Sequence, residues 1–129
     1  MVIPGDILEE LVAAAVSVRS RAHAPYSEFA VGAAVYAGGR IYRGCNVENA
    51  SYPVGLCAER GAIAAAVADG QKIIDGVVVA AARAVPPCGM CRQAIAEFGP
   101  AATVVLVGVE DGQRIVTDMA ALFPARFEL

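Results

Sequence analysis

Residues 76–98 read GVVVAAARAVPPCGMCRQAIAEF and join a strand pattern to a helix pattern. The run Gly76–Ala82 is apolar throughout and contains three valines, which is typical of a central strand covered on both faces. Pro86 and Pro87 break this strand, and Gly99-Pro100 closes a helix predicted from Cys88 to Phe98. A strand that leads directly into a helix in this way favours an α/β fold.

Patterns on either side of this stretch predict the other elements. On the N-terminal side we expect a helix over 4–21, strands over 29–36 and 40–46, and a helix over 57–68. On the C-terminal side we expect strands over 103–109 and 113–117 and a short helix over 119–122. This order predicts one domain, residues 1–129, with a mixed five-stranded sheet between helices in a three-layer α/β/α fold.

The composition is unusually apolar, with 57% hydrophobic residues and a mean hydropathy of +0.57. No apolar run approaches the roughly 18 residues that a membrane span requires. The excess therefore suggests surface that is buried against other subunits. Residues 1–6 lack the basic and apolar regions of a signal peptide, so we expect a cytoplasmic protein with reduced cysteines.

The charge distribution disfavours a polynucleotide partner. The net charge is −3 and the pI is about 5.0. Lys72 is the only lysine, and the arginines are scattered along the chain. A protein that neutralises a phosphate backbone needs a basic stripe, which this sequence does not contain.

Cys57-Ala58-Glu59 opens one predicted helix, and Pro87-Cys88-Gly89-Met90-Cys91 opens the next. Helix N-termini stabilise thiolates, and two cysteines three residues apart lie on one side of a helical turn. Three thiolates can hold zinc and leave a fourth position open, as catalytic zinc sites do. Glu59 would then move protons beside the metal, and Arg60 would offset the thiolate charge by donating hydrogen bonds to sulfur.

The cysteines also allow roles without zinc catalysis. A lone C-x-x-C is also found in redox pairs and in structural zinc sites. Cys45 could complete a four-cysteine site in a small zinc-stabilised interaction protein, although a buried free thiol is the commoner role. His23 is the only histidine and we expect it at the surface, so the sequence gives no support to histidine-based catalysis.

Three blocks of sequence resemble the small homotetrameric zinc-dependent cytidine deaminases. One block is Asn46-Val47-Glu48-Asn49-Ala50-Ser51-Tyr52, which leads into Cys57-Ala58-Glu59-Arg60. The others are residues 25–34, PYSEFAVGAA, and residues 87–93, PCGMCRQ. A Pro-Cys-x-x-Cys segment with a third cysteine and a non-ligand glutamate is the signature of zinc deaminases.

This resemblance implies a cytidine-deaminase-like fold and hydrolytic deamination of cytidine and 2′-deoxycytidine in pyrimidine salvage. It implies one Zn²⁺ per chain, bound by Cys57, Cys88 and Cys91, with Glu59 as the catalytic proton shuttle. It also implies a homotetramer that acts on small nucleosides. A related amino-heterocycle or a modified cytosine nucleoside is the alternative substrate.

The resemblance also implies a set of substrate-binding residues: Phe29, Asn46, Glu48, Ala50, Tyr52 and Phe127. Asn46 and Glu48 would hold the ribose 3′-hydroxyl, Phe29 would pack on the pyrimidine, and Phe127 would reach a neighbouring subunit's site. The residues by themselves also allow turn or capping roles for the Asn and the Glu, and packing roles for the aromatics. The segment before Pro87 and the C-terminal tail are shorter than is usual in the family, which affects the expected pocket wall.

Overall fold

The structure is a computed structural model that describes residues 3–129. Residues 1 and 2, part of the N-terminal segment in which we expect no signal peptide, lie outside the described residues. The elements follow in the order α1 (Gly5–Arg19), β1 (Gly32–Ala37), β2 (Arg40–Cys45), η1 (Tyr52–Val54), α2 (Ala58–Ala68), β3 (Ile74–Ala81), α3 (Gly89–Phe98), β4 (Thr103–Gly108), β5 (Arg114–Asp118) and α4 (Met119–Leu122).

The five strands form one mixed sheet in the order β2-β1-β3-β4-β5. Strands β3 and β4 are parallel, with Val77 opposite Val104, and the other neighbouring pairs are antiparallel. The parallel pair requires a crossover connection, and α3 supplies it. The predicted mixed five-stranded sheet is thus confirmed.

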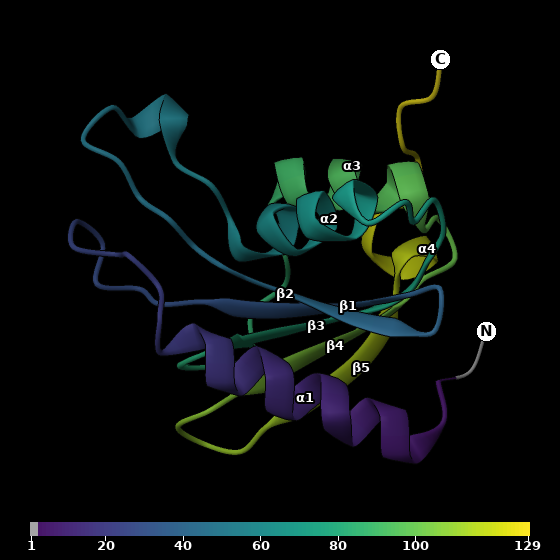
Figure 1. Cartoon of the computed structure of the whole chain (residues 1–129), viewed down its shortest axis with the longest axis horizontal. Helices are drawn as coiled ribbons and strands as arrows, with labels where there is room; N and C mark the ends of the chain where they lie inside the picture. Colours follow the sequence, from purple (N-terminus) through teal and green to yellow (C-terminus); the bar gives the residue numbers. More distant parts are fainter. Residues whose placement is uncertain (1–2) are drawn as a thin grey trace.

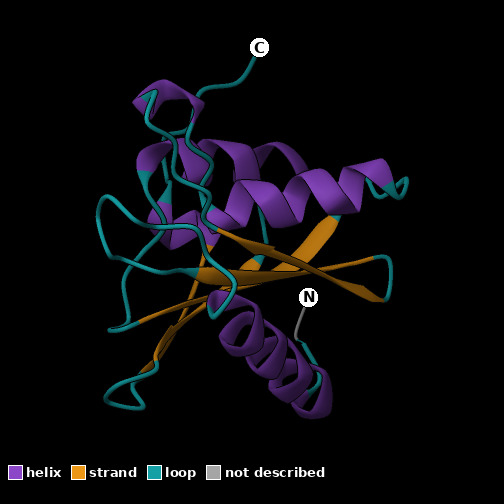
Figure 2. Ribbon diagram, turned by 60° about the vertical axis from the view of Figure 1, so that its left-hand side comes forward, coloured by secondary structure: helices purple, strands orange, loops and turns teal. Residues whose placement is uncertain are grey.

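Helices cover both faces of the sheet (Figures 1 and 2). Helices α2, α3 and α4 pack on one face, where Val77 and Val79 of β3 belong to their hydrophobic cluster. Helix α1 packs on the other face, where Val78 and Ala80 belong to a second cluster. Because successive side chains of a strand point to opposite faces, the continuous apolar run of β3 fills both cores. The three-layer α/β/α arrangement is confirmed.

Several predicted boundaries were wrong by a few residues. The first strand begins at Gly32 and not at Phe29, because the Asn46 side chain takes the backbone hydrogen bonds of this segment. Cys57 and Cys88 are the N-cap residues of α2 and α3 rather than their first helical residues. The short 3-10 helix η1 was not predicted.

Among the described residues, no helix is both long and apolar enough to cross a membrane.

Candidate metal centre and active site

Three cysteine sulfurs gather at the N-terminal ends of α2 and α3. The Sγ atoms of Cys57, Cys88 and Cys91 all lie within 4.8 Å of one another, and those of Cys57 and Cys88 are 3.9 Å apart. Neither N-cap cysteine uses its side chain to cap its own helix. The sulfurs are therefore available to a shared ligand.

The surroundings of Cys57 stabilise its thiolate. A hydrogen bond from Cys91 is the largest influence, and with further hydrogen bonds from Arg60 and Cys88 it lowers the pKa of Cys57 to about 5. The same interaction raises the pKa of Cys91, which is fully buried. The neighbours of Cys57 thus favour its thiolate form.

This set of donors fits zinc. Zinc–sulfur bonds of about 2.3 Å in a tetrahedral site place the sulfurs about 3.8 Å apart, close to the 3.9 Å between the Cys57 and Cys88 sulfurs. All four cysteines of the chain are free thiols, and Cys45 lies outside the cluster. Three protein ligands leave one position of a tetrahedral zinc site open, as in catalytic sites.

Glu59 is the buried charged residue of the core, with only 5% of its surface exposed. It lies in the first turn of α2, close to the cysteine that caps this helix, so the helix fixes its position. Burial raises the pKa of its carboxyl group, and the negative charge of Cys57 acts in the same direction. A carboxyl group with a raised pKa holds a proton more strongly than an exposed one, which suits a residue that takes up and returns a proton.

The Arg60 guanidinium group lies beside the Cys57 sulfur. Its guanidinium nitrogen Nη2 lies 3.9 Å from Cys57 Sγ and donates to the Gly55 carbonyl at 3.4 Å. The hydrogen bond to Cys57 raises the pKa of Arg60. Its Nε is buried without a hydrogen-bond partner in the described structure. The positive charge therefore lies close to the Cys57 sulfur, and the role of Arg60 in offsetting the thiolate charge stays a prediction.

A cavity of about 270 Å³ opens beside the cysteines. It is lined by residues from five segments of the chain: Ser27, Phe29, Val31, Asn46, Glu48, Cys57, Ala58, Glu59, Val79, Val85, Pro86 and Cys88. Six of the predicted site residues, namely Phe29, Asn46, Glu48, Cys57, Glu59 and Cys88, are in this set. The cavity thus combines a metal-ligand cluster, a buried carboxyl group and a polar end.

The polar end of the cavity is formed by Asn46 and Glu48, which follow strand β2. The Asn46 amide accepts from the Val31 N–H and donates to the Phe29 carbonyl, both at 2.8 Å. The Glu48 carboxylate accepts from the Tyr26 and Ser27 backbone N–H groups and from the Ser27 hydroxyl. The hydroxyl bond is the largest influence that lowers the pKa of Glu48, so this carboxylate is ionised.

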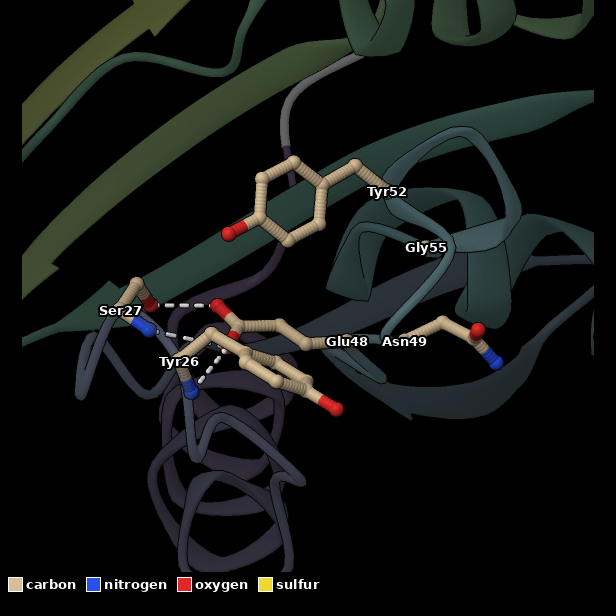
Figure 3. A pocket seen from close by; sticks show the side chains of 6 residues that line it. All are labelled: Tyr26, Ser27, Glu48, Asn49, Tyr52 and Gly55. Carbon is tan, nitrogen blue, oxygen red and sulfur yellow. Dashed lines mark hydrogen bonds between the residues drawn. The ribbon is translucent and has the colours of Figure 1, made fainter.

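The remaining predicted substrate-binding residues lie outside this cavity. Tyr52 lines a neighbouring pocket with Tyr26, and their rings meet edge to face at 6.2 Å (Figure 3). Ala50 is exposed in the loop before η1. Phe127 is 67% exposed in the C-terminal tail, beside α3 and away from the cysteine cluster in the same chain. Their assignment to the site stays a prediction.

Sequence reasoning missed Ser27, which lines both pockets. Val85 and Pro86 line the cavity and belong to the segment before Pro87 that was expected to affect the pocket wall. Ser27 belongs to one of the blocks that resemble the family, but nothing in its local sequence singles out the serine. Its partner, Glu48, lies 21 residues away in the sequence. A pairing of this kind depends on the fold and leaves no local pattern.

Known proteins resemble this chain over most of its length. The family model described as "Cytidine and deoxycytidylate deaminase zinc-binding region" matches residues 6–107. A cytidine deaminase of Sporosarcina psychrophila is 42% identical over 123 residues, covering 93% of this chain and 90% of the relative. One from Halalkalibacterium halodurans is 42% identical over 120 residues, covering 91% of each. The crystal structure of cytidine deaminase from Burkholderia pseudomallei is 41% identical, with a TM-score of 0.87, over 92% of this chain and 98% of that one.

Proposed function

This chain belongs to the family of cytidine and deoxycytidylate deaminases with a zinc-binding region, and on that premise we propose that it hydrolyses cytidine and 2′-deoxycytidine. Water replaces the 4-amino group of the base, giving uridine or 2′-deoxyuridine and ammonia. The observation that carries this proposal is a cluster of three cysteine sulfurs, two of which line one cavity together with the buried Glu59.

We assign metal binding and proton transfer to different residues of the chain. Cys57, Cys88 and Cys91 would hold Zn²⁺, which when bound supplies a Lewis acid that makes water easier to deprotonate. The Glu59 carboxylate accepts one proton from the attacking water and delivers it to the ring nitrogen of the base. It then takes the second proton of that water, from the newly formed hydroxyl group, and delivers it to the departing amino group, which leaves as ammonia. Burial favours the protonated form of Glu59, so the residue can retain that proton until the leaving group needs it.

Substrate orientation is assigned to the polar end and wall of the cavity. Phe29 would pack on the pyrimidine, since it lines the cavity and is partly exposed. Asn46 and Glu48 would hold the 3′-hydroxyl of the sugar, because both retain unused hydrogen-bonding capacity after their contacts within the chain.

The decisive assay follows the absorbance change as cytidine is converted to uridine, with and without a zinc chelator. We expect turnover that chelation abolishes, and about one zinc per chain. A zinc-loaded, folded protein that leaves cytidine unchanged would contradict the proposal. A panel of other amino-substituted bases would then identify the alternative substrate.

A pair of matched variants tests the role of Glu59. Glu59→Gln removes the proton acceptor while keeping the size of the side chain, so turnover should be lost and zinc retained. Glu10→Gln makes the same chemical change on the exposed surface of α1 and should leave turnover unchanged. Retained activity in Glu59→Gln would remove the carboxylate from the mechanism.

We also propose that the chain forms a homotetramer in which Phe127 completes a neighbouring subunit's site. Large apolar side chains are exposed near the loops that flank the cavity: Tyr26, Phe29, Val47, Tyr52, Val54 and Met90. A second copy of the chain would cover this surface and remove it from water. Light scattering that shows a stable monomer at assay concentrations would refute this assembly.

Pyrimidine salvage in the cytoplasm is the setting that we propose for this activity. The free thiols are suited to a reducing compartment, and the acidic chain lacks a basic stripe for polynucleotides. Loss of growth on cytidine as sole pyrimidine source after gene deletion would be the expected result, and unimpaired growth would contradict it.

A further inference from the structure

The hydroxyl of Ser27 connects the two parts of the cavity that are assigned to substrate. Ser27 lies in the loop between α1 and β1, whereas Glu48 lies in the loop that follows β2. The Ser27 hydroxyl donates its proton to Glu48 Oε2 and accepts the Phe29 backbone N–H at 3.0 Å. Figure 3 shows the Glu48 carboxylate turned toward Ser27. One hydroxyl therefore links the residue expected against the base to the residue expected against the sugar.

The hydrogen bonds of the Glu48 carboxylate leave limited room for a ligand. Oε1 accepts the Tyr26 N–H at 3.0 Å and the Ser27 N–H at 3.1 Å, which occupies both of its lone pairs. Oε2 accepts the Ser27 hydroxyl and keeps one lone pair. An incoming hydroxyl donor thus has one acceptor position, and its direction is set by the bond to Ser27.

We propose that Ser27 is a positioning residue that gives the reaction its selectivity for nucleosides with a 3′-hydroxyl, by fixing the free acceptor of Glu48. This inference rests on the proposed role of Glu48 as the acceptor for that hydroxyl. The backbone N–H groups alone anchor only Oε1, so without the Ser27 hydroxyl the carboxylate can rotate about Oε1 through small changes in the Glu48 side-chain torsions. Rotation moves Oε2 away from the sugar, and the bond to the 3′-hydroxyl weakens.

The test compares kcat/KM for cytidine and 3′-deoxycytidine in the intact enzyme and in Ser27→Ala. Hydrogen bonds to charged groups are worth about tenfold or more in binding. Ser27→Ala should therefore lower kcat/KM for cytidine by about tenfold, mainly through KM, and change that for 3′-deoxycytidine by less than about twofold. The ratio of kcat/KM for cytidine to kcat/KM for 3′-deoxycytidine should therefore fall. An equal loss on both substrates would overturn the proposal, because it would mean that Ser27 only holds the loop together.

Two further variants separate positioning from general damage. Ser27→Thr keeps the hydroxyl and has room for its methyl group at this exposed position, so the substrate ratio should return to near that of the parent enzyme. Ser20→Ala removes an exposed serine hydroxyl whose bond is to Ser17 within the end of α1, and it should leave both substrates unaffected. A Ser27→Thr enzyme as unselective as Ser27→Ala would contradict the role of the hydroxyl.

A double-variant comparison keeps the result interpretable if Ser27→Ala is less stable. Glu48→Gln should lower the substrate ratio by itself, and adding Ser27→Ala should lower it no further, because one residue acts through the other. If Glu48→Gln and Ser27→Ala lower the substrate ratio independently, so that their effects multiply in the double variant, the proposal is overturned. If the parent enzyme itself does not distinguish cytidine from 3′-deoxycytidine, the sugar role of Glu48 fails and the role of Ser27 fails with it. A selective parent enzyme with an equally selective Ser27→Ala variant refutes the role of Ser27 alone.

Discussion

Replacing Gly44 by alanine should push helix α2 away from strand β2 and disturb the metal centre. A Cβ atom at Gly44 would lie 2.4 Å from both the Ala58 carbonyl oxygen and the Ala62 nitrogen. Both atoms belong to the backbone of α2, so no side-chain rotation can relieve the contact. Ordinary contacts begin at 3.4 Å, so the helix must recede by 3.4 − 2.4, or about 1 Å.

The energetic cost follows from this overpacking. Insertion of a methyl group into a filled contact costs about 1–3 kcal/mol. Alanine recovers about 0.5–1 kcal/mol relative to glycine in a strand. We therefore expect the free energy of unfolding, measured by urea denaturation at fixed protein concentration, to fall by up to about 2.5 kcal/mol.

The kcat/KM for cytidine should fall strongly in Gly44→Ala even where the protein stays folded. Cys57 caps α2 and Glu59 lies in its first turn, so both move with the helix. A displacement of about 1 Å at reacting groups costs up to about a hundredfold in rate. We expect kcat/KM for cytidine to fall between about tenfold and a hundredfold in Gly44→Ala at full zinc occupancy.

Gly61→Ala is the matched control at the same contact. A Cβ atom there would meet the Leu56 side chain at 3.6 Å and Gly44 Cα at 3.7 Å, which are ordinary distances. Because alanine favours a helix over glycine by about 1 kcal/mol, this variant should be at least as stable as the parent. A Gly44→Ala protein with unchanged stability and activity would refute the packing argument.

Three further predictions concern the metal-ligand loop, the sugar end and the tail. Arg92 donates hydrogen bonds to the carbonyls of Pro87 and Leu122 at 2.8 Å each. Arg92→Met should therefore lower the free energy of unfolding by about 1–3 kcal/mol and weaken zinc retention, and an unchanged urea midpoint would contradict this. Hydrogen bonds from Ser27 and the Tyr26 N–H lower the pKa of Glu48, so KM for cytidine should stay constant from neutral pH down to 4.5 and rise only as that carboxylate is protonated at lower pH. If KM already rises at a pH well above 4.5 as the pH is lowered, a group other than Glu48 binds the sugar. Deletion of the last three residues, including Phe127, should raise KM for cytidine without unfolding the subunit, and an unchanged KM would remove the tail from the site.

The cysteine cluster and the glutamate beside it could be predicted from the sequence because their signals are local. Two cysteines spaced by one helical turn, and a glutamate two residues after a third cysteine, are patterns that the helix N-termini of α2 and α3 preserve in the fold. The buried strand β3 was equally recognisable, since covering both faces requires a continuous apolar run.

The sequence by itself therefore determined which residues are candidates for the chemistry, whereas the tertiary structure decided how they are held. Asn46 reaches across 15 residues to pair with Val31 and so delays the start of β1, and Ser27 meets Glu48 across 21 residues. Gly44 matters only because α2 lies directly against it. These contacts join segments that the sheet brings together, and no local periodicity records them because they depend on the relative placement of elements distant in the chain.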